Sequence, residues 1–417
     1  MKKLLAITGP FVPHNETVTL LSYKHLRELD VDVTVVALEG KEDETIKKEL
    51  EDDVKFSKFN IKYSNCDWHK LSINKQNLNI FKIIYNLYKY YKMTINESKK
   101  ERYDYIYSSS IPNYTHAIAN KIKKKYKNNI MWIASFSDPI KDNLYTELEN
   151  SKAKTIKGKI VNFVNNKIHN NPKYQEQTLK NADCLIFVSE EQRDYMVGDN
   201  EEYKQKSMII PFTYIKDWEI YKELLKPNMF KNKKEELKLV HFGNIYGLRK
   251  IDNFLEAIKK IQSENPDLLK NVVIEQYGFI EKSYIDKIEK LNLKNIFKIY
   301  DKITYKECIK KMKEDTDCLI IFDTILEEDK GQPWLPSKIL EYLISKKPIF
   351  SVCNKKSPIY RLLNKEHICT TYDIQDIKNK LQYQLENVKD KEFDEMILEN
   401  EFVQQKALQK IVNRKEK

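Results

Sequence analysis

The chain has 417 residues, of which 41% are hydrophobic and 32% are charged. This composition is typical of a folded globular protein of two or three domains and excludes a chain that is disordered throughout. The formal net charge of +11 favours negatively charged partners, among them nucleotide phosphates, anionic lipid surfaces and nucleic acid.

Strand-like and helix-like segments alternate through the first half of the chain. Residues 4–8 are apolar but are soon interrupted by Gly9 and Pro10, so we interpret them as a buried strand and not as a signal peptide. A helical spacing at 15–29 and a β-branched run at 31–38 complete a strand–helix–strand opening. The same pattern predicts a parallel sheet, with a further helix at 114–127 and further strands at 105–108, 131–135 and 184–189.

Two longer helical segments, 78–99 and 154–180, interrupt this alternation. Each places Lys beside Ile, Phe, Tyr or Val at helical spacing, and the second is broken near residues 170–172. We favour the interpretation that each helix has a solvated face over a packed face. The alternative is an interfacial patch that touches anionic lipid.

A second series begins after Pro211 and the polar stretch 216–236. It predicts another doubly wound domain, smaller than the first, and is followed by a charged helical tail at 391–412. The expected helices lie at 248–263, 284–291, 304–313 and 337–345, and the expected strands at 237–242, 272–277, 296–299, 318–322 and 348–352.

The fold class expected from this pattern is α/β, with two doubly wound, Rossmann-like domains. We place the first domain at residues 1–211, the second at 212–390, and a C-terminal helix that packs across the domain junction at 391–417. Ligands of open parallel sheets bind at the carboxyl ends of the strands. Two such sheets facing each other across a cleft would therefore place two ligands in one cleft.

The segment 336–350 predicts a helix start, a carboxylate one turn later and a buried strand. Pro336 suits the first turn of a helix, and Ser337 can cap the free N–H groups there. The positive end of this helix faces the loop 327–335 and can hold an anion, while Glu341 can accept two hydroxyl protons from a ribose. These features describe a nucleotide-sugar site. An ordinary amphipathic helix with an exposed Glu is the equal alternative.

Four motifs span most of the chain. They are DYIYSSSIP (104–112) with WIASFSDP (132–139), ADCLIFVS (182–189) with KSMIIP (206–211), HFGNIYGLR (241–249), and PSKILEYLISKKPIF (336–350). The ordered set resembles the retaining glycosyltransferases of family 4, which have the GT-B fold. The resemblance implies an enzyme of bacterial surface-polysaccharide type, with an acceptor-binding first domain and a second domain that binds a nucleotide-diphosphate sugar.

The sequence departs from this family at two places that bear on the site. The family commonly has two Glu separated by seven residues; the second matches Glu341, but Pro333 stands at the first position, which usually lies near the reacting sugar. The glycine-rich turn after the first strand is reduced to Gly9, which limits the close approach of a phosphate. Three carboxylates of the preceding loop can substitute for the first Glu: Glu327, Glu328 and Asp329.

Negative charge develops on the leaving diphosphate during sugar transfer and must be stabilised. Arg249 and Lys250 follow the loop 243–247, and the resemblance places a basic pair here, in contact with the diphosphate. Arg offers a planar two-pronged donor and Lys a mobile charge, so we favour this role over that of solvated first-turn residues. The base is expected where two later strands end. The whole nucleotide site then comprises Gly243, Asn244, Tyr277, Ile303, Ser337, Lys338 and Glu341.

Asp138 follows the expected strand at 131–135. In the family this region orients the acceptor or the sugar, and a carboxylate here can accept the proton of the acceptor hydroxyl. A helix N-cap or an Asp-Pro turn is the equal alternative. His116 lies on an expected helix and His241 on an expected strand, and we interpret both as structural.

The six cysteines are scattered without a CxxC pair, and three lie in apolar runs. This indicates buried, reduced thiols and a cytoplasmic protein, with peripheral contact at the inner face of the cell membrane left open. No cluster of His, Cys, Asp or Glu has metal-ligand spacing, so we expect neither a metal nor a cofactor. The expected partners are a nucleotide-sugar donor and a glycan, lipid-linked or other hydroxyl acceptor.

Three other classes of protein compete with this one. A nucleotide-sugar epimerase on the same fold needs more acid–base groups than the motifs supply. A non-catalytic basic binding protein predicts Lys and aromatic residues in one groove, but the Lys residues are spread over many helices, so no nucleic acid is expected. A dinucleotide oxidoreductase needs a G-x-G-x-x-G motif after a first strand, which neither half contains.

Overall fold

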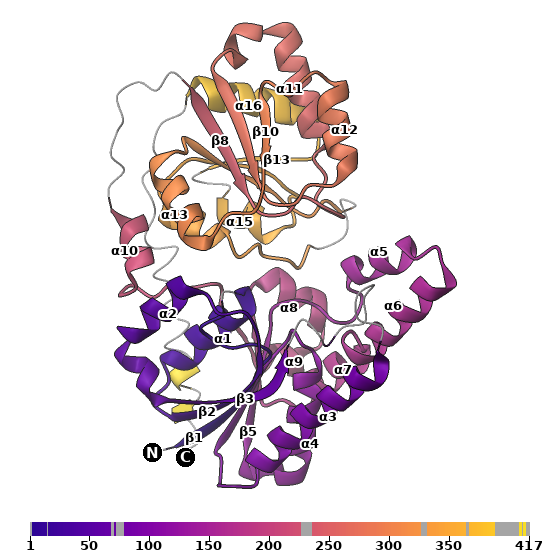
Figure 1. Ribbon diagram of the computed structural model, residues 1–417, viewed down its shortest axis with the longest axis vertical. Coiled ribbons are helices and arrows are strands. Elements are labelled where there is room, and N and C mark those ends of the chain that lie inside the picture. The colour runs from indigo at the N-terminus through magenta and orange to yellow at the C-terminus, as the bar shows by residue number, and fades with distance from the viewer. Residues whose placement is uncertain are drawn as a thin grey trace. The chain divides into compact units, whose positions relative to one another are not determined.

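The protein is described by a computed structural model (Figure 1), which divides into two compact units. One unit is formed by Met1–Thr213 together with Met396–Lys417, and the other by Tyr214–Glu395. The residues that the structure describes are 2–14, 16–67, 71, 79–226, 236–326, 332–363, 367–387, 408–410 and 412–413.

The first unit contains a seven-stranded parallel sheet with the order β3-β2-β1-β4-β5-β6-β7. Ala6 in β1, for example, lies beside Val35 on one side and beside Tyr107 on the other. The strands are β1 (Lys3–Ile7), β2 (Asp32–Glu39), β3 (Phe59–Asp67), β4 (Tyr105–Ser109), β5 (Met131–Phe136), β6 (Cys184–Phe187) and β7 (Ser207–Ile209).

Helices connect these strands, and several begin at a side chain that caps their first turn. Asn143, Thr155 and Asn171 each accept a hydrogen bond from the backbone of the helix that follows. The helices are α1 (Thr17–Arg27), α2 (Glu44–Glu51), α3 (Ile80–Glu97), α4 (Tyr114–Tyr126), α5 (Leu144–Lys152), α6 (Ile156–Ile168), α7 (Pro172–Asn181), α8 (Glu190–Val197) and α9 (Glu201–Gln205), with 3-10 helices η1 (Val54–Lys58) and η3 (Lys127–Asn129).

The second unit contains a six-stranded parallel sheet with the order β10-β9-β8-β11-β12-β13. Its strands are β8 (Leu237–Phe242), β9 (Val272–Tyr277), β10 (Phe297–Tyr300), β11 (Cys318–Phe322), β12 (Ile349–Val352) and β13 (Ile368–Thr370). Its helices are α10 (Glu219–Leu225), α11 (Asp252–Glu264), η4 (Pro266–Leu269), α12 (Lys282–Lys290), α13 (Tyr305–Glu314), α14 (Ile339–Ile344), α15 (Pro358–Leu363) and α16 (Ile374–Glu386).

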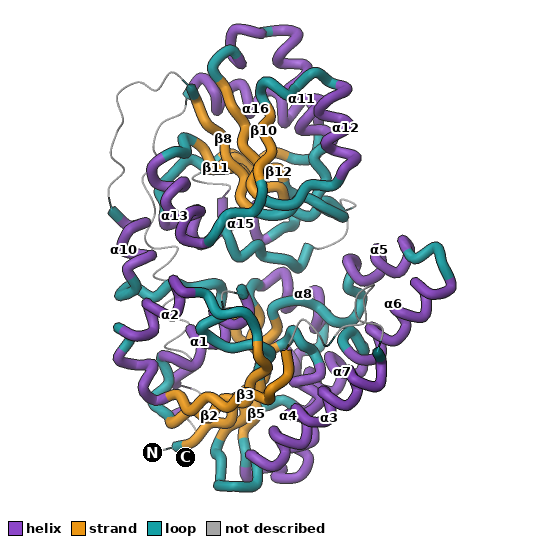
Figure 2. Tube along the Cα trace, viewed as in Figure 1, coloured by secondary structure: helices purple, strands orange, loops and turns teal. Residues whose placement is uncertain are grey.

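Each sheet forms the centre of its unit and helices cover it, as the orange strands and purple helices of Figure 2 show. In the second unit, Leu239, Ile320 and Phe350 come from three neighbouring strands and pack in one core with Phe254 of α11. Trp132 of β5 is fully buried in the corresponding core of the first unit. Burial of both sheet faces explains why the central strands are such continuous apolar runs.

The predicted fold class is confirmed, because both units are doubly wound parallel sheets. The predicted strands 237–242, 272–277 and 318–322 coincide with β8, β9 and β11, since each contains a largely apolar run with a sharp end. The pattern does not predict β3, β7 or β13. Strands β7 and β13 are only three residues long and β3 is largely half-exposed, so none of the three gives a clear sequence signal.

Helix α14 begins two residues later than predicted. Its N-cap residue is Lys338, whose side chain makes no capping hydrogen bond, so the cap lies one residue beyond the predicted position at Ser337. The carbonyl groups of Pro336 and Ser337 accept hydrogen bonds from the N–H groups of Ile339 and Leu340 at 3.1 and 3.2 Å. This turn places Lys338 at the start of the helix.

The described end of the chain, 408–410 and 412–413, is helical and packs on the first unit. The carbonyl oxygen of Val412 accepts hydrogen bonds from the Tyr105 hydroxyl at 2.5 Å and from Lys2 Nζ at 3.1 Å. The remainder of the expected tail helix lies outside the described residues. All six cysteines are free thiols, and five of them are buried.

Candidate nucleotide-sugar site

Two glycine turns meet at the carboxyl ends of the neighbouring strands β8 and β9. Gly243 has a φ of 126° and Gly278 a φ of 118°, values that residues with a Cβ rarely adopt. A Cβ on Gly278 would lie 3.0 Å from the carbonyl oxygen of Gly243 and 3.1 Å from Asn244 Oδ1. Asn244 is exposed, and its Oδ1 accepts a hydrogen bond from the Phe279 N–H at 3.1 Å. The two turns therefore form one closely packed edge of the sheet.

Lys338 lies directly beside the first of these turns. A Cβ on Gly243 would lie only 2.7 Å from Lys338 Nζ, so the glycine makes room for the ammonium. Burial, together with repulsion from Arg249, holds the pKa of Lys338 well below its usual range. A bound anion at this position would stabilise the charged form of the lysine.

A chain of hydrogen bonds holds Lys338 in place. Its Nζ lies 2.9 Å from His241 Nε2, and His241 Nδ1 lies 2.5 Å from Gln276 Oε1. Gln276 Nε2 then donates to the carbonyl oxygen of Gly243 at 2.6 Å. This pattern assigns the proton of the imidazole to Nδ1 and leaves Nε2 as the acceptor of the lysine. Burial and the charge of Lys338 hold the pKa of His241 well below its usual range, so the ring is neutral and positions the lysine.

Arg249 belongs to the same edge of the sheet. Its Nη1 donates to the carbonyl oxygen of Asn244 at 3.1 Å, and its guanidinium carbon lies 6.0 Å from the centre of the Tyr246 ring. Its charge lowers the pKa of both Lys338 and His241, as expected for a cation close to both. We name His241, Arg249 and Lys338 the basic cluster. Lys250, predicted beside Arg249, is exposed.

Asp323 is a buried carboxylate next to the basic cluster that the sequence analysis missed. It follows β11, and its Oδ1 accepts hydrogen bonds from the Thr324 N–H at 2.8 Å and from Gln332 Nε2 at 2.5 Å. Burial raises its pKa from 3.8 to about 6, against the opposing effects of these bonds and of Arg249. A carboxylate directly after the apolar run CLIIF was the available signal.

We expect Asp323→Asn to alter how stability depends on pH. The folded state retains the proton up to about pH 6 and the unfolded state only to about pH 4, so the free energy of unfolding falls as pH rises between these values. The variant should lack this fall, which is at most about 3 kcal/mol. Urea denaturation at several pH values measures it, with the exposed Asp267→Asn as control. A wild-type pH profile in Asp323→Asn would contradict the assignment.

Glu341 lies one turn into α14, at the position predicted to bind the ribose. Its Oε1 accepts a hydrogen bond from the Tyr305 hydroxyl at 2.8 Å, and that hydroxyl lies 3.4 Å from the hydroxyl of Tyr221. Burial and the charge of Glu341 hold the pKa of Tyr305 well above its usual range, so Tyr305 stays a donor. The half-buried carboxylate is thus held in a fixed orientation by a neutral phenol.

The Tyr277 ring is not free to stack on a base. It stacks with Phe242 at 5.4 Å and with Tyr300 at 4.9 Å between ring centres. These two residues are its register partners on β8 and β10, which flank β9 on opposite sides. Both ring faces are therefore covered. The predicted base position near Tyr277 and Ile303 cannot use the Tyr277 ring, whereas Tyr300 is 42% exposed.

In the first unit, Asp138 lies at the carboxyl end of β5, as predicted. Its Oδ2 accepts a hydrogen bond from Ser137 Oγ at 3.2 Å, and Ser137 Oγ lies 3.0 Å from Ser110 Oγ, beyond the end of β4. A short polar cluster therefore stands at the end of two central strands. His116 is buried, and its Nδ1 lies 2.8 Å from Ser108 Oγ, which supports a structural role.

The segment before α14 is only partly described. Gln332 and Pro333 are both buried, so the position where the family has its first Glu holds an apolar side chain inside the second unit. The carboxylates considered as substitutes, Glu327, Glu328 and Asp329, lie outside the described residues.

Among the residues that the structure describes, no group of three or more His, Cys, Asp or Glu side chains is placed to hold a metal ion. No helix of the described part is long and apolar enough to cross a bilayer.

Solved structures with a similar fold cover nearly the whole chain. HepE from Anabaena in complex with UDP-glucose covers 100% of this chain and 99% of its own, with a TM-score of 0.61 and 11% identity. The E. coli trehalose-6-phosphate protein bound with UDP-2-fluoro glucose covers 99% and 96%, with a TM-score of 0.57 and 10% identity. The lipopolysaccharide outer core galactosyltransferase WaaB covers 93% and 91%, with a TM-score of 0.54 and 12% identity.

No protein-family model matches the sequence, and no curated protein matches it either. At identities near 10%, the likeness to solved structures establishes the fold alone. The chain has the GT-B fold, with two Rossmann-like α/β domains.

Proposed function

We propose that the protein is a retaining glycosyltransferase that moves a sugar from a nucleotide-diphosphate sugar to a hydroxyl acceptor, a surface glycan or a glycolipid. The observation that carries this proposal is the basic cluster at the carboxyl edge of the second sheet, with Glu341 one turn into the helix that Lys338 begins. Structural neighbours that hold UDP-glucose or its fluorinated analogue support a donor of this class.

The site provides positive charge where the reaction develops negative charge. In the proposed reaction the bond between the anomeric carbon and the diphosphate oxygen breaks, and its electron pair stays on the diphosphate. Lys338 and Arg249 stabilise that charge, the first as a point charge and the second as a planar fork. The acceptor oxygen bonds to the anomeric carbon, and Asp138 of the first unit is the proposed acceptor of its proton.

The cations of the basic cluster supply charge that other transferases obtain from a metal, so we propose a reaction without metal or cofactor. Six free cysteines favour a reducing compartment, and we place the reaction in the cytoplasm. Glu341 is proposed to accept hydrogen bonds from the ribose hydroxyl groups of the donor.

A panel of nucleotide-diphosphate sugars that differ in base and sugar tests the function by thermal shift, because a bound ligand raises the melting temperature. We expect at least one to do so, and we expect Glu341→Ala to weaken its binding in calorimetry by about tenfold, or about 1.4 kcal/mol. Glu289→Ala, an exposed carboxylate on α12, is the matched control. If no donor raises the melting temperature, the function is wrong; if Glu341→Ala binds normally, the ribose assignment is wrong.

A further inference from the structure

Helix α3 carries an exposed apolar stripe. Phe81, Ile84, Tyr85 and Tyr88 are between 51% and 83% exposed, and their spacing of three and four residues places them on one side of the helix. The opposite side packs into the first unit, where Tyr90 is fully buried. The helix is therefore anchored on one side and apolar towards solvent on the other.

Helix α6 carries a second stripe, and the chain itself buries no residue of this helix. Ile156, Ile160 and Phe163 share one side and are between 58% and 80% exposed. The favoured interpretation of a packed face holds only in part for α6, because Ile168 packs against the core of the first unit but no residue of the helix is fully buried. Apolar side chains gathered in this way on an exposed surface mark a site of interaction.

The same helices are strongly basic. Helix α3 carries three Lys, α4 four and α6 three, whereas the single carboxylate among them, Glu97, is buried. Lys89 and Lys167 extend over the exposed rings of Tyr85 and Phe163, with Nζ 5.8 and 5.6 Å from the ring centres. Apolar and aromatic groups are thus interleaved with positive charge.

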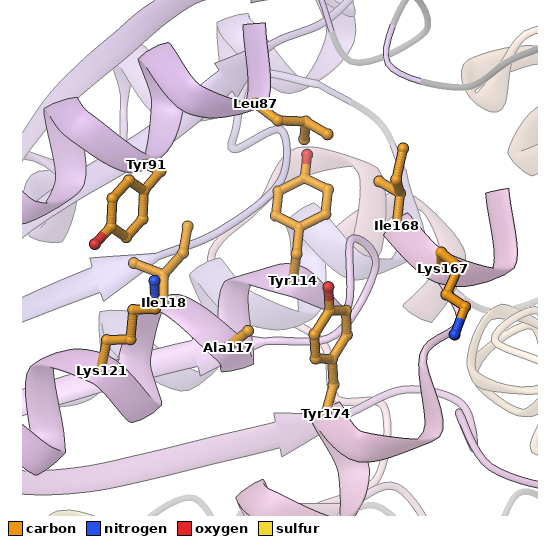
Figure 3. A pocket seen from close by; sticks show the side chains of 9 residues that line it. All are labelled: Leu87, Tyr91, Tyr114, Ala117, Ile118, Lys121, Lys167, Ile168 and Tyr174. Carbon is orange, nitrogen blue, oxygen red and sulfur yellow. The ribbon is translucent and has the colours of Figure 1, made fainter. Parts of the chain in front are cut away.

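A cavity of about 240 Å³ lies between α3, α4, α6 and α7. Leu87 lines it from α3, one turn after Ile84, and Lys167 lines it from α6, one turn after Phe163. The hydroxyl of Tyr114 points into the space below Leu87 (Figure 3), is buried, and has no hydrogen-bond partner among the described residues. The cavity thus offers an unused hydrogen-bonding group beneath a basic rim.

We propose that this surface docks on an anionic lipid bilayer. We name the two stripes and the cavity lined by α3, α4, α6 and α7 the α3–α6 face. Its apolar side chains enter the boundary between headgroups and acyl chains, its lysines meet lipid phosphates, and the cavity admits part of one lipid. Charge favours a bilayer over a second copy of the chain, since two such faces would bring lysine against lysine.

The apolar part of the proposal is tested with the full chain and sedimented vesicles. Binding is expected to vesicles with about one third phosphatidylglycerol and to be much weaker to phosphatidylcholine alone. The double variant Phe81→Ser with Phe163→Ser should bind at least about tenfold more weakly. The matched control, Val54→Ser with Tyr383→Ser, changes two equally exposed side chains elsewhere and should bind normally.

The contribution of positive charge to binding is tested by replacing lysines with glutamates. Lys157→Glu with Lys159→Glu on α6 should lower vesicle affinity at least about tenfold. Added salt should also weaken vesicle binding by the wild-type protein. Lys282→Glu with Lys290→Glu on α12 makes the same change of charge in the second unit and should have a small effect. All of these side chains are exposed, so melting temperatures should stay near the wild-type value.

Three outcomes would overturn the proposal. They are no binding of the wild-type protein to anionic vesicles, equal binding by the patch variants and their controls, and a dimer in solution that the Phe81 and Phe163 changes dissociate. The readout is lipid binding and does not depend on sugar transfer. A failed donor screen would therefore not count against the membrane proposal. A failure to bind lipid would likewise not count against the nucleotide site.

Discussion

Replacing Lys338 by Met is expected to lower kcat/KM for sugar transfer by about 100-fold, equivalent to about 2.7 kcal/mol. Met retains the length of the stem and removes the ammonium, which stands 2.9 Å from His241 Nε2 beside Gly243. Initial rates of nucleoside diphosphate release measure the effect. Arg249→Ala should lower kcat/KM by at least about tenfold but by less than Lys338→Met does. The Arg249 side chain is more open to solvent, so its charge is better screened.

Proton uptake provides a second, independent readout of the Lys338 contact. The pKa of Lys338 is lowered in the free protein, and a diphosphate that binds there raises it, so binding at a pH above the lowered pKa is accompanied by proton uptake. Calorimetry in two buffers with different ionisation enthalpies should detect this uptake in the wild-type protein and not in Lys338→Met. The exposed Lys282→Met is the control. Wild-type rates and uptake in a folded Lys338→Met protein would remove the residue from the site.

Much of the fold can be predicted from the sequence because central parallel strands are continuous apolar runs with sharp ends. The runs of β8, β9 and β11 have no other plausible conformation once helices of the right length separate them. The edge strand β3 is half-exposed, so its side chains lack both a continuous run and a strict alternation. Strand pairing, and not local pattern, defines such a strand.

The candidate site shows a different limit. Resemblance and local chemistry point to Arg249, Lys338 and Glu341, which lie at the carboxyl edge of one sheet. They do not predict that His241 and Asp323 lie beside the lysine, because those contacts join residues separated by up to 97 positions. Helix α6 has the same apolar period whether it faces a core or a membrane, so its exposed stripe also required the structure.

Gly243→Ala is expected to remove most of the donor affinity by displacing Lys338. The new Cβ would lie 2.7 Å from Lys338 Nζ, and the mobile end of the lysine would move away before the backbone does. The φ of 126° adds backbone strain, with a loss of about 1–3 kcal/mol of stability. Gly198→Ala separates the two effects, because Gly198 also has a positive φ, 58°, but has nothing within 4 Å of the added Cβ.

A double-mutant cycle tests whether the glycine acts through the lysine. If it does, Gly243→Ala should lower turnover strongly in the wild-type background and hardly at all in a Lys338→Met background, where no ammonium remains to be displaced. The loss of stability should persist in both backgrounds, because strain at Gly243 depends on φ and not on its neighbour. Additive effects on turnover would show that Gly243 serves the donor by direct backbone contact and not by leaving room for the lysine ammonium.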